Sequence, residues 1–361
     1  MISAYPTRTL RSTTSAREPN RRLIGIFCYG LSCAFLISCT AAEQVTQFGG
    51  STMGTTYQVT YASTGAPASE EITGVEELLV EINDSLSTYI ETSLISRVNR
   101  SVDTEAWNPI DTHFETVFRR SREIHLETDG AFNPAIGPLV DAWGFGPEGP
   151  GKIPDAATIT SLLESTSLDA FEIRASPPGL RKRDAGARLD FSAIAKGYAV
   201  DAVAMRLESW GVTEYFVEIG GEVRTRGAHP TGRSWRIGIE RPVENATVRG
   251  TIQTSVALRD GALATSGNYR NHRVEDGRKI VHILNPATGH PEVGSLLSVS
   301  VLAEDVMSAD AYATAFMVMG IDRALRFVEE KPGVEAYFIV SDAAGGIVET
   351  RSSGFPEPPE D

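Results

Sequence analysis

The chain has 361 residues, 41% of them hydrophobic, which is enough for one large domain or two smaller ones with a packed core. The formal charge is −14, and because residues 1–39 hold five arginines and one glutamate, the remainder carries −18. A body this acidic argues against nucleic-acid binding and against binding an anionic membrane surface, so any phosphate ligand would be held locally by a metal, backbone amides or single basic side chains.

The N-terminal segment has the pattern of an export signal. Its arginines precede an uncharged apolar run, Leu23 to Ser38, which ends at Cys39. The ending "LISC" resembles a bacterial lipobox, so we expect residues 1–39 to be a signal peptide and Cys39 to carry a lipid anchor on the periplasmic side of the cell envelope. A plain secretion signal or an uncleaved anchor are the alternatives. All three cysteines lie in this leader, so no disulfide is expected in the body.

The body predicts helices and strands without steady alternation. "TYQVTYA" has strand periodicity, and helical spacing begins at Ile72 and again around Phe114. "ARLDFS" predicts a short strand that leads into the helix "AIAKGYAVDAVAMRLESW". Several strands follow, and a buried helix is predicted from Ser308 to Gly320. This order favours a mixed α+β fold over a doubly wound sheet.

A segment rich in glycine and proline runs from Gly130 to Pro147. Glycines let the backbone approach a ligand, and prolines fix the course of a loop. The large aromatics Phe132, Trp143 and Phe145 could stack on a flat ring system. A packed irregular connection over the core explains the same pattern.

The stretch "LDFSAIAKGYAVD" passes from a strand into a helix. Asp190 lies at the strand end, Ser192 is placed to cap the helix, and Lys196 follows about one turn later. A helix N-terminus beside a lysine can bind an anion. An ordinary capped helix with an exposed lysine remains the alternative. Further on, the glycine pair of "VEIGGEVRTRG" predicts a turn or bulge at a strand edge.

Two later motifs also carry alternatives. Asp310 and Thr314 are four residues apart, so a carboxylate and a hydroxyl share one face of the predicted helix. They could hold Mg²⁺, which needs few protein oxygens, or Asp310 could complement the helix dipole. His282 comes shortly before the turn-forming pair Asn285-Pro286 and is either a structural residue or a catalyst.

The order of these motifs resembles that of the ApbE family of flavin transferases. The resemblance runs from about Ser51 to Val340 and rests on "STMGTTYQV", "LSTYIETSLISRVN", "GAFNPAIGPLVDAWGFG", "LDFSAIAKGYAVD", "VEIGGEVRTRG", "ATSGNYRN", "HILNPATGHP" and "SADAYATA". It implies an ApbE-like, T-fold-related catalytic unit over residues 40–350. The acidic, proline-rich residues 351–361 are then expected to be a disordered tail.

The resemblance also implies a set of site residues. The family's FAD contacts fall on Met53, Tyr89, Ala131, Phe132, Asn133, Asp190, Lys196, and His282 with Ile283. Its Mg²⁺ ligands fall on Asp310, Thr314 and the backbone carbonyl of Ala193. The chain departs from many members at Asn133 and Asn285, where those members have aspartate.

The implied reaction is Mg²⁺-dependent transfer of FMN from FAD to a threonine hydroxyl of a partner protein, with release of AMP. His282 is the candidate base for the threonine proton. The expected partners carry a motif like Ser-Gly-Ala-Thr and belong to membrane redox complexes. Two alternatives remain open: hydrolysis of the FAD pyrophosphate to FMN and AMP, and storage of flavin by a non-catalytic periplasmic lipoprotein.

Overall fold

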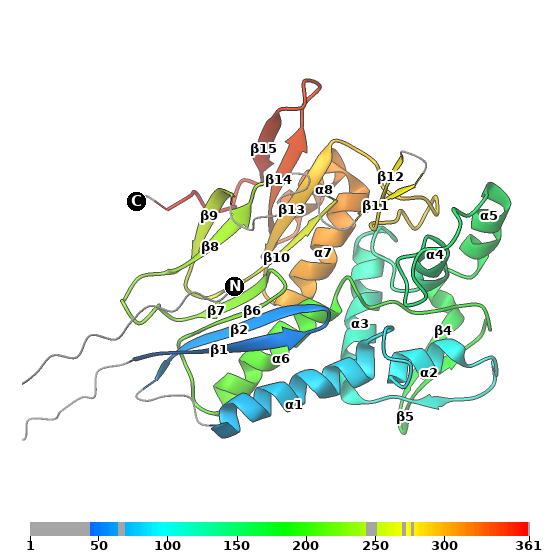
Figure 1. The fold of residues 1–361 in the computed structure, drawn as a ribbon, viewed down its shortest axis with the longest axis horizontal. Helices are drawn as coiled ribbons and strands as arrows, with labels where there is room; N and C mark the ends of the chain where they lie inside the picture. The colour runs from blue at the N-terminus through cyan, green and yellow to red at the C-terminus, as the bar shows by residue number, and fades with distance from the viewer. Residues whose placement is uncertain (1–43, 64–68, 243–250, 269–271, 276–277, 360–361) are drawn as a thin grey trace, which may run out of the picture. The chain divides into compact units, whose positions relative to one another are not determined.

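The computed structural model describes residues 44–359, apart from residues 64–68, 243–250, 269–271 and 276–277. The predicted signal peptide and Cys39 lie outside the described residues. The part from Ala42 onward forms one compact unit (Figure 1). Within the described residues, no helix is both long enough and apolar enough to cross a bilayer.

An antiparallel sheet of eight strands forms the centre of the unit. Its strands follow the spatial order β1-β2-β6-β7-β10-β13-β14-β15, so segments far apart in the sequence become neighbours. The bounds are β1 (Gln44–Thr52), β2 (Thr55–Ser63), β6 (Tyr215–Ile219), β7 (Glu222–Arg226), β10 (Gly261–Gly267), β13 (Leu296–Ala303), β14 (Glu335–Ser341) and β15 (Ile347–Arg351).

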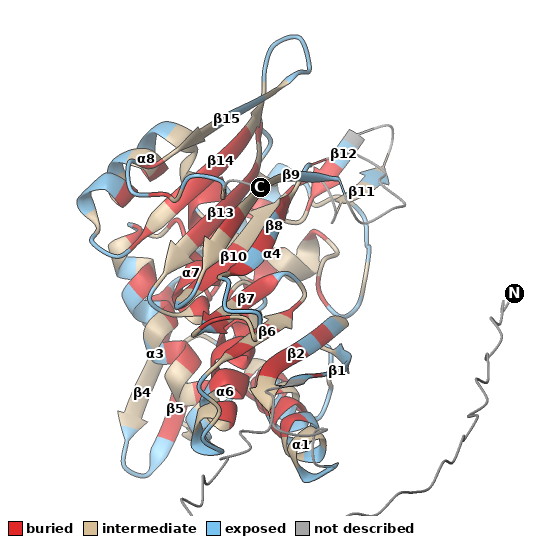
Figure 2. Cartoon of the chain, turned by 90° about the vertical axis from the view of Figure 1, so that its left-hand side faces the viewer, coloured by how far each residue is buried: buried red, intermediate tan, exposed pale blue. Residues whose placement is uncertain are grey.

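Helices cover one face of this sheet. The five longer helices are α1 (Ser69–Leu86), α3 (Thr112–Glu127), α6 (Ala195–Ser209), α7 (Val306–Met319) and α8 (Ile321–Glu330). Helix α6 packs on β6 and β7, α7 on β10 and β13, and α8 on β14. Figure 2 shows buried residues along most of α6, which is typical of a helix enclosed on several sides.

The other face of the sheet is covered by a hairpin of β8 (Trp235–Glu240) and β9 (Ile252–Leu258). Alternation along β14 separates the two cores, because Phe338 packs with the helices while Tyr337 and Ile339 pack with the hairpin. The sheet is therefore buried on both faces where it carries the site.

Smaller elements extend the unit beyond the helices. A three-stranded sheet contains β3 (Asn108–Pro109), β5 (Pro178–Lys182) and β4 (Phe171–Ala175), and a hairpin contains β11 (His272–Glu275) and β12 (Arg278–Val281). The remaining helices are α2 (Leu94–Arg100), α4 (Gly137–Ala142), α5 (Ala156–Glu164) and a 3₁₀ turn at Leu168–Ala170. A third apolar cluster, containing Leu139, Trp143 and Ile280, joins α4 and α5 to β12.

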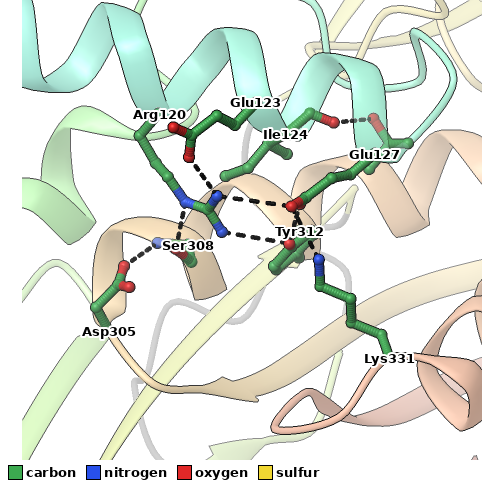
Figure 3. Close-up of polar contacts among 9 residues, drawn as sticks. Arg120, Glu123, Ile124, Glu127, Asp305, Ser308, Tyr312 and Lys331 are labelled. Atoms are coloured by element: carbon green, nitrogen blue, oxygen red, sulfur yellow. Dashed lines mark hydrogen bonds and ion pairs between the residues drawn. The ribbon is translucent and has the colours of Figure 1, made fainter.

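The outer side of α7 is fixed by a polar cluster from α3 and the end of α8 (Figure 3). Arg120 Nε donates to Ser308 Oγ at 2.9 Å, and its Nη2 donates to the Tyr312 hydroxyl at 3.3 Å. The same hydroxyl donates to Glu127, whose carboxylate lies 2.8 Å from Lys331 Nζ. Both α7 side chains in this cluster are almost fully buried.

The predicted α+β fold is confirmed, but the expectation of a disordered tail over residues 351–361 is wrong in its first half. Arg351 ends β15, and the backbone N–H of Ser352 donates to Ala336 O at 2.9 Å. Phe355 is buried and stacks on Tyr337 with ring centroids 5.6 Å apart. Composition averaged over the segment concealed this one aromatic anchor, whose burial is worth more than the ordering of a few polar neighbours costs.

Candidate functional site

A cavity of about 1220 Å³ opens where the central sheet meets the helices and the loops on either side of α4. This is larger than the usual small-molecule pocket of roughly 300–1,000 Å³, so a ligand as long as a dinucleotide can be enclosed. The twelve residues that the family resemblance assigned to FAD contact or Mg²⁺ binding all line it: Met53, Tyr89, Ala131, Phe132, Asn133, Asp190, Ala193, Lys196, His282, Ile283, Asp310 and Thr314.

Met53 reaches the cavity from a tight hairpin turn. Thr52 pairs with Thr55, so Met53 and Gly54 form the whole loop, with φ of 49° and 73°. Left-handed angles at both positions are typical of a type I′ turn, in which a methionine is unusual. Asn83 of α1 donates to Thr52 Oγ1 at 3.0 Å and fixes the turn against the helix.

Aromatic residues form one wall of the cavity. The Tyr89 hydroxyl donates to Phe145 O at 2.8 Å, and the residue as a whole is 65% exposed, so its ring can offer a flat surface to a ligand. Phe132 and Phe145 also line the cavity, and the His282 ring lies edge-on to Phe145 with centroids 6.4 Å apart. Trp143 does not line it: it is buried, and its Nε1 donates to Gly289 O at 2.7 Å. For Trp143 the structure therefore supports the alternative of a packed connection over stacking on a ligand.

The α6 N-terminus differs from the prediction at Ser192. The helix begins at Ala195 with Ile194 as its N-cap, and no side chain caps it. Ser192 is exposed, and its backbone N–H donates to Asp190 Oδ1 at 2.7 Å. This local bond closes a turn before the helix, which delays the helix start by two residues.

Asp310 lies at the closest approach of α6 and α7. It is only 3% exposed, and its Oδ2 accepts the backbone N–H of Gly197 at 3.0 Å. A Cβ at Gly197 would lie 2.3 Å from Val306 O, so only glycine allows this approach. Burial argues against the alternative in which Asp310 merely complements the helix dipole at the surface.

Thr314 lies one turn further along α7 and shares the cavity face with Asp310. Its Oγ1 is 2.9 Å from Ser266 Oγ of β10, which sets the rotamer of the hydroxyl. Among the described residues, no cluster of three His, Cys, Asp or Glu side chains has the geometry of a metal site. A cation here would therefore have at most two such side chains, and would depend on hydroxyl and carbonyl oxygens and on oxygens from outside the chain.

Glu222 is a site residue that the sequence analysis did not identify. It begins β7 directly after Gly220 and Gly221, whose φ angles of 66° and 110° form a two-residue turn. Its side chain is 3% exposed, and its Oε1 lies 3.0 Å from Lys196 Nζ. The same ammonium lies 3.7 Å from Asp310 Oδ1. The motif "VEIGGEVRTRG" predicted the turn, but no local signal showed which way the glutamate would point.

Burial and charge oppose each other in this group. Burial raises the pKa of Glu222 to about 7, although the nearby Lys196 ammonium acts to lower it. Burial would lower the pKa of Lys196, but Asp310 and Glu222 outweigh that effect and leave the pKa above its usual value. Lys196 is therefore a fixed positive charge between two carboxylates.

Sequence comparison identifies the family. A sequence profile of the ApbE family matches residues 53–338. The chain belongs to the ApbE family. It is 36% identical to the FAD:protein FMN transferase of Vibrio cholerae, over 90% of this chain and 96% of that protein. It is 34% identical to the FAD:protein FMN transferase of Haemophilus influenzae, over 88% of this chain and 93% of that protein.

Solved structures agree with the ApbE assignment. The flavin transferase ApbE from Vibrio cholerae superposes with a TM-score of 0.77 over 87% of this chain and 98% of that chain. The ApbE flavinyl transferase of Pseudomonas stutzeri, in its apo form, has the same TM-score at 35% identity. The match covers 86% of this chain and 95% of that chain. The resemblance inferred from motif order is confirmed.

Asn133 and Asn285, where the family resemblance leads us to expect aspartate in many members, have structural partners in this chain. Asn133 Nδ2 donates to Thr166 O at 2.9 Å, and its Oδ1 accepts from the Ala135 N–H at 2.9 Å. Asn285 Nδ2 likewise donates to Glu292 Oε2 at 2.9 Å. An aspartate cannot donate either bond, so the amide matches its neighbours at both positions.

Proposed function

We propose that this chain transfers FMN from FAD to a threonine hydroxyl of an acceptor protein and releases AMP. The observation that carries the proposal is the gathering of an aromatic wall, a fixed lysine, a buried carboxylate and a histidine in one cavity. The names of the relatives, FAD:protein FMN transferase, support the same reaction class.

The donor set around Asp310 fits Mg²⁺. We propose that Asp310, Thr314 and the backbone carbonyl of Ala193, all at the cavity wall, would hold the ion. Mg²⁺ characteristically takes one or two carboxylates and completes its shell with water and substrate phosphate, which agrees with the one carboxylate, Asp310, in this donor set. When bound, the ion neutralises charge on the pyrophosphate oxygens of FAD.

The other residues would bind FAD and move the proton. Tyr89 and Phe145 provide flat surfaces for the rings of FAD, the largely buried Phe132 contributes to the cavity wall, and Lys196 offers a positive charge to the phosphates. The acceptor oxygen attacks the phosphorus of the FMN half, and the bond to the AMP oxygen breaks. His282 would accept the threonine proton, while AMP leaves with the electron pair of the broken bond.

The test uses purified protein, FAD, Mg²⁺ and an acceptor carrying a Ser-Gly-Ala-Thr motif. Mass spectrometry should show an acceptor that has gained FMN, and chromatography should show equimolar AMP. An acceptor with valine in place of the threonine should stay unmodified. Free FMN and AMP without acceptor modification would favour FAD hydrolysis, and intact FAD would favour flavin storage.

Asp310→Ala should lower transfer at least about 100-fold, since the cation loses its only carboxylate. Because alanine also leaves the Gly197 N–H without an acceptor, circular dichroism must show that the variant is folded. Transfer at the wild-type rate by a folded Asp310→Ala protein would contradict the proposed metal site.

We also propose that the protein is a lipoprotein on the periplasmic side of the bacterial envelope and modifies subunits of membrane redox complexes. The support is the sequence pattern of residues 1–39, which ends at Cys39. Cys39→Ala should prevent lipid attachment, as judged by mass spectrometry of the mature N-terminus, and should release the protein from the membrane fraction. An unlipidated wild-type N-terminus would contradict the proposal.

A further inference from the structure

The buried Glu222 carboxylate forms an ion pair with Lys196. Its Oε1 pairs with Lys196 Nζ at 3.0 Å, and its Oε2 has no hydrogen-bond partner among the residues that the structure describes. Its position is set by the Gly220-Gly221 turn and by burial against α6. A change in the charge of Glu222 therefore acts first on Lys196.

The Lys196 ammonium lies near two carboxylates, those of Glu222 and Asp310. Its ammonium is closer to Glu222, at 3.0 Å, than to Asp310, at 3.7 Å. With Glu222 ionised, the group contains two negative charges and one positive charge, which leaves one net negative charge. Because Lys196 is satisfied mainly by Glu222, that charge stays largely on Asp310.

We propose that Glu222 is a positioning residue that holds the Lys196 ammonium away from Asp310 and so keeps the Asp310 carboxylate available to a divalent cation. This inference rests on the proposed metal role of Asp310. It assigns to the "GGE" turn a function in cation affinity, in addition to its place in the sheet.

The physical reason lies in competition between two cations. Without the Glu222 charge, Lys196 would pair with Asp310 in a poorly solvated site, where opposite charges attract strongly. The net charge of the three side chains would then change from −1 to zero. An incoming divalent ion would have to displace the Lys196 ammonium from the Asp310 carboxylate. Removing the lysine as well would restore the single negative charge on Asp310.

The experiment measures Mn²⁺ binding to the full chain without FAD, by electron paramagnetic resonance of the free ion. Glu222→Gln keeps the shape of the side chain and removes its charge, and should raise the Kd of Mn²⁺ about 10- to 100-fold. The double variant Glu222→Gln with Lys196→Met should return the Kd to within about threefold of the wild type. Asp310→Asn should abolish specific binding in either background.

A matched control is available on α6. Glu208 pairs with Arg226 at 2.8 Å and accepts from the Tyr215 hydroxyl at 2.6 Å, and it does not line the cavity. Glu208→Gln removes the same charge and should leave Mn²⁺ binding unchanged. If Glu222→Gln does not fold, Glu222→Met removes the same charge at a similar side-chain size and should likewise raise the Kd of Mn²⁺ about 10- to 100-fold.

Each outcome decides the question. Unchanged binding by folded Glu222→Gln would overturn the inference while leaving the metal proposal intact. Weakened binding that Lys196→Met does not restore would also overturn it, because Glu222 would then act on the cation itself. If Glu208→Gln weakened Mn²⁺ binding equally, the loss would be explained by the overall charge of the protein, and the inference would be overturned. No specific Mn²⁺ binding by the wild type would contradict the proposed metal site itself.

Discussion

At the scale of single residues, Asn285 shows how a neighbour determines whether an amide or an acid fits the turn beside His282. Its Nδ2 donates to Glu292 Oε2, and its Oδ1 accepts the backbone N–H groups of Ala287 and Thr288. Asn285→Asp would keep the two accepted bonds but place a second carboxylate 2.9 Å from the first. We expect the variant to lose about 1–2 kcal/mol of unfolding free energy at pH 7, measured by urea denaturation.

The partner residue provides the control. Adding Glu292→Gln to Asn285→Asp restores a donor facing an acceptor, so most of the lost stability should return, while Glu292→Gln alone should change little. A double variant no more stable than Asn285→Asp would show that the pair does not interact as the structure places it.

At the scale of elements, the cluster on the outer side of α7 determines how firmly the helix carrying Asp310 is held (Figure 3). Burial alone would raise the pKa of Glu127, but hydrogen bonds from Lys331 and Tyr312 outweigh it and leave that pKa below its usual value. A carboxyl group with a lowered pKa stabilises the fold above its unfolded pKa, and this contribution is lost as the pH falls through the folded pKa.

Glu127→Gln should therefore lower the unfolding free energy at pH 7 by about 1–2 kcal/mol. This lies between the losses of stability that are typical when an exposed and a buried salt bridge are broken. The difference from the wild type should shrink toward zero as the pH falls through the lowered pKa of the folded wild-type carboxyl. Glu123 is the matched control, because it pairs with the same Arg120 but is 61% exposed. A pH-independent effect of Glu127→Gln would contradict a role for its charge.

The contact between α6 and α7 offers a second test at this scale. Gly197→Ala would push a methyl group into Val306 O, so the helices must separate and Asp310 must lose the Gly197 N–H. We expect a loss of about 1–3 kcal/mol in urea denaturation, together with weaker Mn²⁺ binding. Gly151→Ala meets nothing within 4 Å and should change neither quantity. Wild-type stability in Gly197→Ala would show that the two helices can separate without cost.

These elements also show what the sequence could predict. Helical spacing from Ile72 predicted α1, whose buried residues include Val75, Leu78 and Ile82, and four-residue spacing placed Asp310 and Thr314 on one face of α7. Both are local patterns. The position of Glu222 beside Lys196 depends on β7 meeting α6, and the need for glycine at 197 depends on Val306, more than 100 residues away. No local window contains such pairings, so the motif resemblance was needed to bring the twelve site residues together.

At the scale of the whole molecule, the cavity joins the β1–β2 turn, the α4 loop, the β6–β7 turn and α7. A ligand that fills it contacts segments from most of the chain and binds only the folded state, so it must raise the unfolding free energy. FAD at 100 times its Kd should add about 2.7 kcal/mol. If the ion bridges Asp310 and the pyrophosphate, Mg²⁺ should tighten FAD binding, and FAD should tighten Mg²⁺ binding by the same factor.

Unfolding by urea with FAD, with Mg²⁺ and with both should therefore show a combined stabilisation larger than the sum of the two separate effects. Chromatography of the flavin must show that FAD is intact during the measurement. Asp310→Asn should keep the stabilisation by FAD alone, because the aromatic wall and Lys196 remain, but should lose the additional effect of Mg²⁺. Simple additivity in the wild type would mean that FAD and the cation bind independently, which is incompatible with an ion held between Asp310 and the phosphates.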